Sequence, residues 1–195
     1  MKAWHERYGE DGLRVIGVHS PGFAPSRDEA AVRAAVARLG VEHPVLIDGE
    51  MELWQEYENV GWPARYLFDG HGRLFDYHYG EGAYEETELA IQELLGLERE
   101  PLPALRAEDR TGAPLLAPSE ERPGAYSGPY EAGAAWAVLE GSGELLVNGE
   151  TVVVVEHPGA YPLVEHARHT RAEIELRPGE GVICHATCFM PGLTA

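Results

Sequence analysis

Cysteine, long apolar runs and signal-like features are scarce in this sequence, and each shortage excludes a class of protein. Cys184 and Cys188 are the only two cysteines in 195 residues, too few for the disulfide framework of a small secreted scaffold. No run approaches the ~18 to 20 consecutive apolar residues of a membrane span, and residues 1–7 lack the apolar core of a signal peptide. As the sequence stands, we expect a soluble, cytoplasmic chain that does not enter a membrane.

Positive charge is also scarce. The chain has 15 Lys and Arg against 33 Asp and Glu, which gives a formal net charge of -18. Phosphate groups are bound by basic surfaces, so the charge balance excludes nucleic acid and anionic membrane surfaces as partners. The hydrophobic content of 44% is sufficient for one domain or two small ones with a real core.

The first 98 residues alternate between strand and helix periodicity. A nearly continuous apolar run is typical of a parallel strand buried on both faces, and helical spacing follows it. An Asp-Gly-x-Gly turn at 69–72 predicts an antiparallel hairpin. We therefore expect α/β layering with helices on both faces of a mixed sheet. The predicted elements are the end of a helix at Trp4–Tyr8, a strand at Leu13–His19, a helix at Asp28–Leu39, a strand at Val45–Asp48, a helix at Met51–Tyr57, a hairpin around residues 69–72 and a helix at Tyr84–Leu95.

The remainder of the chain changes character twice. Residues 99–125 contain five prolines in a polar stretch without a sustained period, which predicts a linker or a surface strap. In residues 126–195 the helical period is absent. Strand-length runs, among them separate strands at 159–165 and 172–176, alternate there with turn signals. One of these signals, Asn148-Gly149, favours a two-residue hairpin. We expect a small antiparallel β-sandwich, so the predicted domains are 1–98 and 126–195, joined by 99–125.

The stretch from Val60 to Asp69 breaks at Trp62-Pro63 and then enters a strand. Pro63 has no N–H for a strand ladder, so it stands at the first residue of a strand or on an edge. A cis peptide bond is also plausible before a proline in such a turn. The spacing leaves an ordinary strand-start proline and a cis-proline as alternatives. Of the aromatic residues around it, only Trp62 is interpreted as part of a binding groove; the others are assigned to the core and rim of the sheet.

The two thiols and three histidines form the other chemical candidates. Cys184 and Cys188 are interpreted as small reduced residues, as a local disulfide or redox pair, or as metal ligands. On paper, His166, His169 and His185 complete a tetrahedral metal site with them. Residues three apart face opposite sides of a regular strand, however, so surface histidines are the favoured interpretation of His166 and His169. We predict no metal and no cofactor.

Four segments of the first domain together resemble the redoxin/TlpA branch of the thioredoxin-like proteins: Leu13–His19, Pro44–Asp48, Gly61–Asp69 and Gly80–Glu88. The chain is most similar to the C-terminal region of DipZ-type proteins, in which a thioredoxin-like domain precedes a β-sandwich that resembles a carbohydrate-binding module. This resemblance implies that Pro63 is a cis-proline beside a redox site and that the backbone of Trp62 pairs with an extended substrate. It also implies protein or peptide thiols and disulfides as partners.

The sequence departs from that family in one respect, because it contains no Cys-x-x-Cys. Residues 1–8 match the end of the helix that begins with this motif in the family, so we expect a thioredoxin-like domain that is incomplete at its N-terminus. The strand that the family places between Leu13–His19 and the Pro63 strand is then also missing. We expect an upstream segment, a second chain or a homodimer to supply it.

Two functions follow from this interpretation. The first is a thiol-disulfide oxidoreductase, truncated and without its own nucleophile. The alternative is a non-catalytic module that binds a peptide, a partner protein or a glycan.

Overall fold

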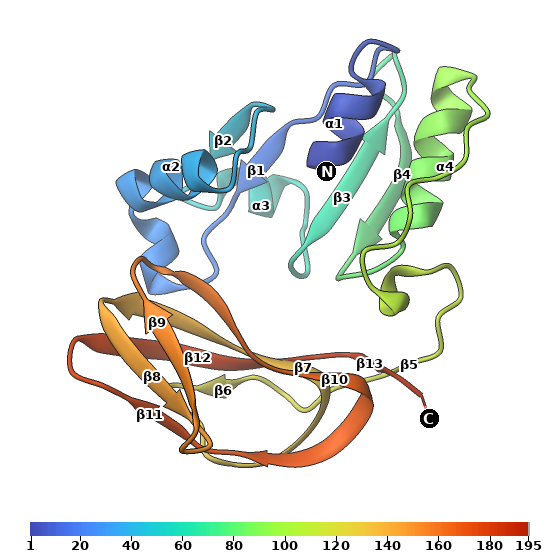
Figure 1. Ribbon diagram of the computed structural model, residues 1–195. Helices are drawn as coiled ribbons and strands as arrows, with labels where there is room; N and C mark the ends of the chain where they lie inside the picture. Colours follow the sequence, from blue (N-terminus) through green and yellow to red (C-terminus); the bar gives the residue numbers. More distant parts are fainter. Residues whose placement is uncertain (195) are drawn as a thin grey trace. The chain divides into compact units, whose positions relative to one another are not determined.

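The computed structural model describes residues 1–194; Ala195, the last residue of the predicted β domain, lies outside the described residues. The chain forms two compact units (Figure 1). The first consists of residues 1–21 and 33–113, and the second of residues 22–32 together with those from 114 onward. Among the helices formed by residues 1–194, none combines the length and the apolar content needed to cross a bilayer.

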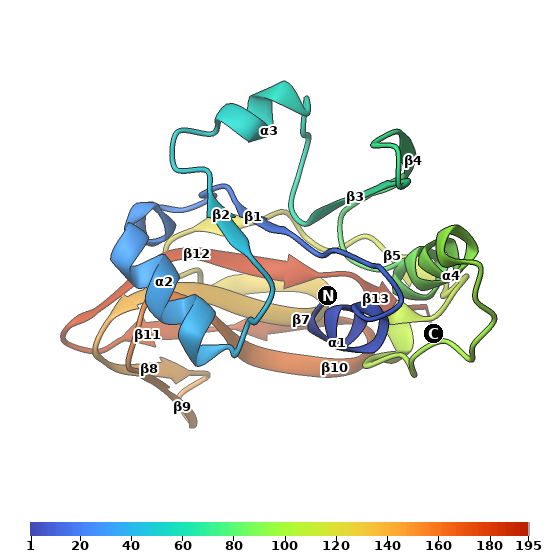
Figure 2. The ribbon, with the colours of Figure 1, turned by 90° about the horizontal axis from the view of Figure 1, so that it is seen from above.

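The first unit contains two separate pairs of strands. β1 and β2 are parallel, with Val18 opposite Leu46, whereas β3 and β4 form an antiparallel hairpin with Tyr66 opposite Tyr77. Within residues 1–194 no strand joins the two pairs. Figure 2 shows α1 on one side of these strands and α3 on the other. The elements are α1 (Lys2–Tyr8), β1 (Gly17–His19), β2 (Val45–Ile47), α3 (Glu52–Glu56), β3 (Ala64–Phe68), β4 (Leu74–Tyr79), α4 (Tyr84–Leu95) and a 3₁₀ turn at Ala107–Asp109.

Local sequence signals explain most of these boundaries. A further helix, α2 (Glu29–Arg38), follows a 3₁₀ turn at Ala24–Arg27 and begins where the carboxylate of Asp28 accepts a hydrogen bond from the N–H of Ala30 at 2.9 Å. The predicted helix Tyr84–Leu95 is confirmed, and Gly96 ends it in the left-handed conformation with φ of 65°. The predicted strand at Leu13–His19 is shorter than expected, because β2 offers partners only to its last three residues.

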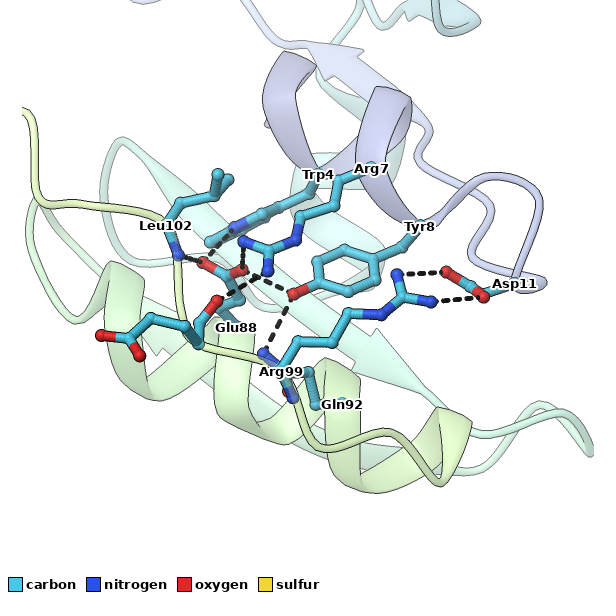
Figure 3. A network of polar contacts seen from close by, with 9 residues as sticks. Trp4, Arg7, Tyr8, Asp11, Glu88, Gln92, Arg99 and Leu102 are labelled. Carbon is cyan, nitrogen blue, oxygen red and sulfur yellow. Dashed lines mark hydrogen bonds and ion pairs between the residues drawn. The ribbon is translucent and has the colours of Figure 1, made fainter.

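A buried carboxylate ties the helices of the first unit together (Figure 3). Glu88 of α4 is only 2% exposed. Its oxygens accept hydrogen bonds from the indole N–H of Trp4 (3.2 Å), the hydroxyl of Tyr8 (2.6 Å), the guanidinium of Arg7 (3.2 Å) and the backbone N–H of Leu102 (2.9 Å). A buried charge is tolerated only when it is paired and hydrogen-bonded. These four donors therefore fix α1 and the segment after α4 against α4.

Apolar contacts and a second row of polar contacts surround this carboxylate. Burial, together with the hydrogen bond to Glu88, raises the pKa of Tyr8 above its ordinary value. Gln92 donates to the Tyr8 hydroxyl at 3.0 Å and accepts from the N–H of Arg99 at 2.6 Å, and Arg99 forms a bidentate ion pair with Asp11. The apolar core beside the network consists of Trp4, Tyr8 and Ile91, with Leu13, Leu67, Tyr84, Leu95, Leu97 and Leu102 packed against them.

The second unit is built from antiparallel strands around one core. One sheet has the order β10-β7-β12-β6, and another the order β11-β8-β9. Side chains of both sheets, among them Leu139 and Leu145, meet in a single buried cluster. The strands are β5 (Leu115–Leu116), β6 (Arg122–Pro123), β7 (Gly128–Gly141), β8 (Gly143–Val147), β9 (Thr151–Val155), β10 (Gly159–Ile174), β11 (Leu176–Pro178), β12 (Val182–Met190) and β13 (Gly192–Leu193).

Two sequence expectations for this unit have different outcomes. The hairpin predicted at Asn148-Gly149 is present: it joins β8 to β9, and both residues have positive φ (52° and 73°), as the central residues of a type I′ turn require. Its loop has three residues instead of the two predicted, because Val147 pairs with Thr151. The break predicted between strands at 159–165 and 172–176 is wrong. Residues 159–174 form the continuous strand β10, which absorbs the irregular segment as register shifts against β7.

We predict that Glu88→Ala lowers the free energy of unfolding of the first unit by about 3 kcal/mol or more, because Arg7, the two buried donors of Trp4 and Tyr8 and the half-buried N–H of Leu102 lose their acceptor. Urea unfolding followed by the far-ultraviolet circular dichroism of α1, α3 and α4, which belong to the first unit, measures the effect. The matched control is Glu93→Gln on the exposed side of the same helix, which should change stability by less than about 0.5 kcal/mol. Equal stabilities for the two variants would contradict the role given to Glu88.

Candidate functional site at the Trp62-Pro63 loop

The loop before β3 presents a tryptophan and a proline side by side. The Trp62-Pro63 peptide bond is cis. The carbonyl of Pro63 accepts a hydrogen bond from the N–H of Gly80 at 2.7 Å, so the ladder between β3 and β4 begins at this residue. Trp62 remains 54% exposed although it lies at the start of a strand. The loop therefore offers a large aromatic surface directly beside the end of a sheet.

Trp62 is held in place by two contacts from other segments. Its indole stacks on that of Trp54 in α3, with ring centroids 4.0 Å apart and an interplanar angle of 29°. Its indole N–H donates to the carbonyl of Ser20, just after β1, at 3.1 Å. Stacked aromatic pairs contribute about 0.5 to 1.5 kcal/mol beyond the area they bury. The exposed ring is consequently fixed in orientation.

Asp48 connects the two segments that hold Trp62. This residue is 6% exposed, and its carboxylate accepts hydrogen bonds from the hydroxyl of Ser20 (2.7 Å) and the backbone N–H groups of Trp54 (3.0 Å) and Leu53 (3.1 Å). Burial by itself raises the pKa of Asp48, but these hydrogen bonds outweigh it and leave the pKa below its ordinary value. Asp48 is thus a charged cap for the start of α3.

Sequence reasoning missed three of these residues. The sequence pattern places Trp54 in the core and rim of the sheet, Asp48 at the end of the strand Val45–Asp48, and Ser20 directly after the strand Leu13–His19. One signal was present for Asp48: an aspartate a few residues before a short helix can accept hydrogen bonds from the unpaired N–H groups of its first turn. Nothing local in the sequence pairs Trp54 with Trp62, because the stack depends on the path of the intervening loop.

The backbone beside this site has two open edges. The N–H of Gly17 and the carbonyl of His19 bond to the β2 side, so the alternation of a parallel ladder directs the backbone of Val18 away from β2. By the same alternation, the bond from Gly80 to Pro63 directs the backbone of Tyr66 away from β4. In the part of the chain that the structure describes, no strand pairs with either edge.

The predicted thiol candidates lie in the second unit, on β12. The thiol of Cys184 donates to the carbonyl of Ala186 (3.5 Å) and that of Cys188 to the carboxylate of Glu121 (3.3 Å). Burial raises the pKa of Cys184, and burial together with Glu121 raises the pKa of Cys188 to about 12. A nucleophilic thiol needs the opposite environment, one that lowers its pKa. Both cysteines are therefore protonated thiols at neutral pH.

The three histidine candidates have separate partners. His166 shares a hydrogen bond with the hydroxyl of Tyr130 at 2.8 Å, and His185 one with Glu140 at 2.8 Å. His169 lies 3.7 Å from a carboxylate oxygen of Glu131. The structure does not bring these imidazoles together, and residues 1–194 contain no group of three or more His, Cys, Asp or Glu arranged to hold a metal ion.

No family model matches the chain. The chain is 36% identical to protein DipZ of Mycobacterium tuberculosis over 115 residues, which are 59% of this chain and 16% of DipZ. It is 31% identical over 121 residues to the chloroplastic protein Suppressor of quenching 1 of Arabidopsis thaliana, covering 58% of this chain and 11% of that protein. It is also 27% identical over 95 residues to the thiol-disulfide oxidoreductase YkuV of Bacillus subtilis, covering 49% of this chain and 64% of YkuV.

The matched region thus spans about a sixth of the length of DipZ. Two of these relatives, DipZ and the oxidoreductase YkuV, support a thioredoxin-like family of thiol-disulfide oxidoreductases for this chain at a coarse level.

We predict that oxidation does not join Cys184 to Cys188. They are four residues apart on one strand, a separation of about 13 Å at ~3.3 Å per residue, whereas a disulfide needs Cα atoms within about 7 Å. Intact mass spectrometry after incubation with diamide tests this, with Cys184→Ser as the control for modification of Cys188 alone. Loss of two hydrogens from the monomer would contradict the prediction.

Proposed function

We propose that this chain is the substrate-holding part of a thioredoxin-fold thiol-disulfide oxidoreductase. The Trp62-Pro63 loop receives an extended stretch of a protein substrate, and the exchanging thiols come from a polypeptide segment outside this sequence. The observation that carries the proposal is the exposed, immobilised Trp62 beside an unpaired strand edge, in a chain similar to a thiol-disulfide oxidoreductase.

The chemistry of the available thiols supports the second half of this proposal. Thiol-disulfide exchange begins with attack by a thiolate. Cys184 and Cys188 have raised pKa values, and their thiols donate to the carbonyl of Ala186 and to the carboxylate of Glu121, acceptors that do not stabilise a thiolate. The first unit contains no cysteine at all. In this proposal, the Trp62-Pro63 loop and the nucleophile therefore belong to different segments.

The open strand edges support the further proposal that another polypeptide segment completes the sheet of the first unit. Two edges flank the gap between β1 and β3, and apolar side chains stand exposed beside one of them, with Ile16 at 65% and Val18 at 49%. Unpaired apolar edges associate with other strands unless they are covered. An upstream segment, a second chain or a second copy of this chain would cover them by strand addition.

The second candidate function is a non-catalytic module that holds a peptide, a partner protein or a glycan. The protonated state of both thiols favours it for the chain acting alone. The Trp54–Trp62 pair suits either function, since the exposed ring of Trp62 can stack on a peptide side chain or on a sugar ring.

We predict fast amide hydrogen exchange at Val18 and Tyr66 in the dilute monomer, because their N–H groups point to the open edges. Gly17 and Arg65, whose N–H groups lie in the ladders, are the controls and should exchange more slowly. If a second copy supplies the strand, the exchange at Val18 and Tyr66 slows as the protein concentration rises. A monomer in which all four amides are equally protected would show that the two edges pair directly, and would remove the need for another strand.

We predict that the chain alone does not accelerate the reduction of insulin by dithiothreitol, yet binds an extended unfolded peptide. Trp62→Ala should weaken that binding by about fivefold or more, because the aromatic surface on which the peptide packs is lost. Trp136→Phe in the second unit should leave the binding unchanged. Isothermal calorimetry measures the binding. Acceleration of insulin reduction that disappears in Cys184→Ser/Cys188→Ser would place the nucleophile in this chain, contrary to the proposal.

A further inference from the structure

The segment that builds the Trp62 site has one sign of charge. Between Arg38 and Arg65 the sequence contains no lysine or arginine, and every charged side chain there is acidic. All of these carboxylates except that of Asp48 are exposed. The acidic residues are Glu42, Asp48, Glu50, Glu52, Glu56 and Glu58.

The aromatic surface at the centre of this acidic segment is open to ligands. One face of Trp62 lies against Trp54, and 54% of Trp62 is still exposed. Tyr57, at the end of α3, is 43% exposed and packs its edge against Tyr66. The face of an indole carries negative electrostatic potential and attracts ammonium and guanidinium groups. Glu52 and Glu56 lie on α3, the helix that carries Trp54, and carboxylates near such a face raise the local concentration of cations further.

A closed ring of contacts sets the orientation of this surface. Asp48 accepts from the hydroxyl of Ser20 and from the N–H of Trp54. The ring of Trp54 stacks on Trp62, and the indole N–H of Trp62 returns to the carbonyl of Ser20. Asp48 is buried and makes its contacts inside the ring, so it acts on a ligand only through the two tryptophans.

We infer that the Trp54–Trp62 pair receives an arginine or lysine side chain of the bound peptide, with Asp48 as the residue that positions the pair. The peptide backbone lies along the Trp62-Pro63 loop, and the cationic group of its side chain rests on the exposed indole face, within the field of the glutamates around α3. The inference rests on the proposed function and specifies its substrate class: basic, extended polypeptide segments.

The first experiment compares three short extended peptides that differ at one central position, which is arginine, its neutral isostere citrulline or glutamate. Calorimetry should show the arginine peptide binding about three- to tenfold more tightly than the citrulline peptide, and the glutamate peptide binding least. The preference for arginine should shrink at high salt. Equal affinities for arginine and citrulline would overturn the inference and leave the proposed function standing. If no peptide binds the wild-type protein, or if only an oligosaccharide does, the proposed function itself fails.

The second experiment separates the acidic segment from the overall charge of the chain. Glu50→Gln/Glu52→Gln should reduce the preference for arginine over citrulline at least twofold. The matched control is Glu93→Gln/Glu98→Gln, which removes the same charge from exposed positions on and after α4 and should leave the preference unchanged. Equal effects of the two double variants would mean that net charge alone attracts the peptide, and would overturn the specificity assigned to the site.

The third experiment tests the role of Asp48. Stacked indoles give a split band in the far-ultraviolet circular dichroism spectrum. Asp48→Asn should diminish this band and the preference for arginine together, while binding of the citrulline peptide stays within about twofold. Ser20→Ala, which removes one donor to Asp48 and leaves the backbone carbonyl in place, provides a milder variant if Asp48→Asn does not fold. A retained split band with a retained arginine preference in the folded variants would overturn the positioning role.

Discussion

The first unit depends on the requirement that a carboxylate removed from water must be surrounded by donors. Glu88 meets it with four donors from two segments: three side chains of α1, and the backbone N–H of Leu102 after α4. The apolar cluster at this place has only three fully buried members, so hydrophobic burial alone is a weak specification of how α1 packs. The directional hydrogen bonds of the carboxylate define the position of α1, since a shift of this helix would leave both the charge and its donors unpaired.

Asp48 is a second buried carboxylate that is surrounded by hydrogen-bond donors. Its donors come from Ser20, after β1, and from the first turn of α3, so it joins a strand end to a helix start. The result is the fixed placement of Trp54, on which Trp62 stacks. A large exposed aromatic ring ordinarily samples several rotamers, and ordering it on binding has an entropic cost. The stack on Trp54 and the hydrogen bond to Ser20 already order the ring, so that cost would not reduce the affinity for the peptide of the proposed function.

Sequence periodicity predicted the parts of the fold that are decided locally. The helix at Tyr84–Leu95 and the hairpin at Asn148-Gly149 follow from amphipathic spacing and turn chemistry, and both are present. The Trp62-Pro63 loop was also identifiable, because a proline directly before a run of strand-forming residues is recognisable from the sequence alone. The contacts of Glu88 were not, since its side-chain partners on α1 lie 80 or more positions away and no periodicity predicts such a pairing. β10 was divided wrongly because its bulges imitate a turn in the sequence, where polar residues interrupt the apolar alternation.

The open strand edges and the Trp62-Pro63 loop are formed by the same two segments of the chain. β1 ends directly before Ser20, whose carbonyl holds Trp62, and β3 begins directly after Pro63. The residues after β1 and before β3 therefore lie next to the open strand edges and also hold the Trp62 ring. A strand added to the edge of β1 or β3 would extend the ladder toward the residues that carry the indole pair. Under the proposed function, a segment that pairs with these edges would also determine how a substrate backbone reaches Trp62, so completion of the sheet and recognition of a peptide would be physically coupled.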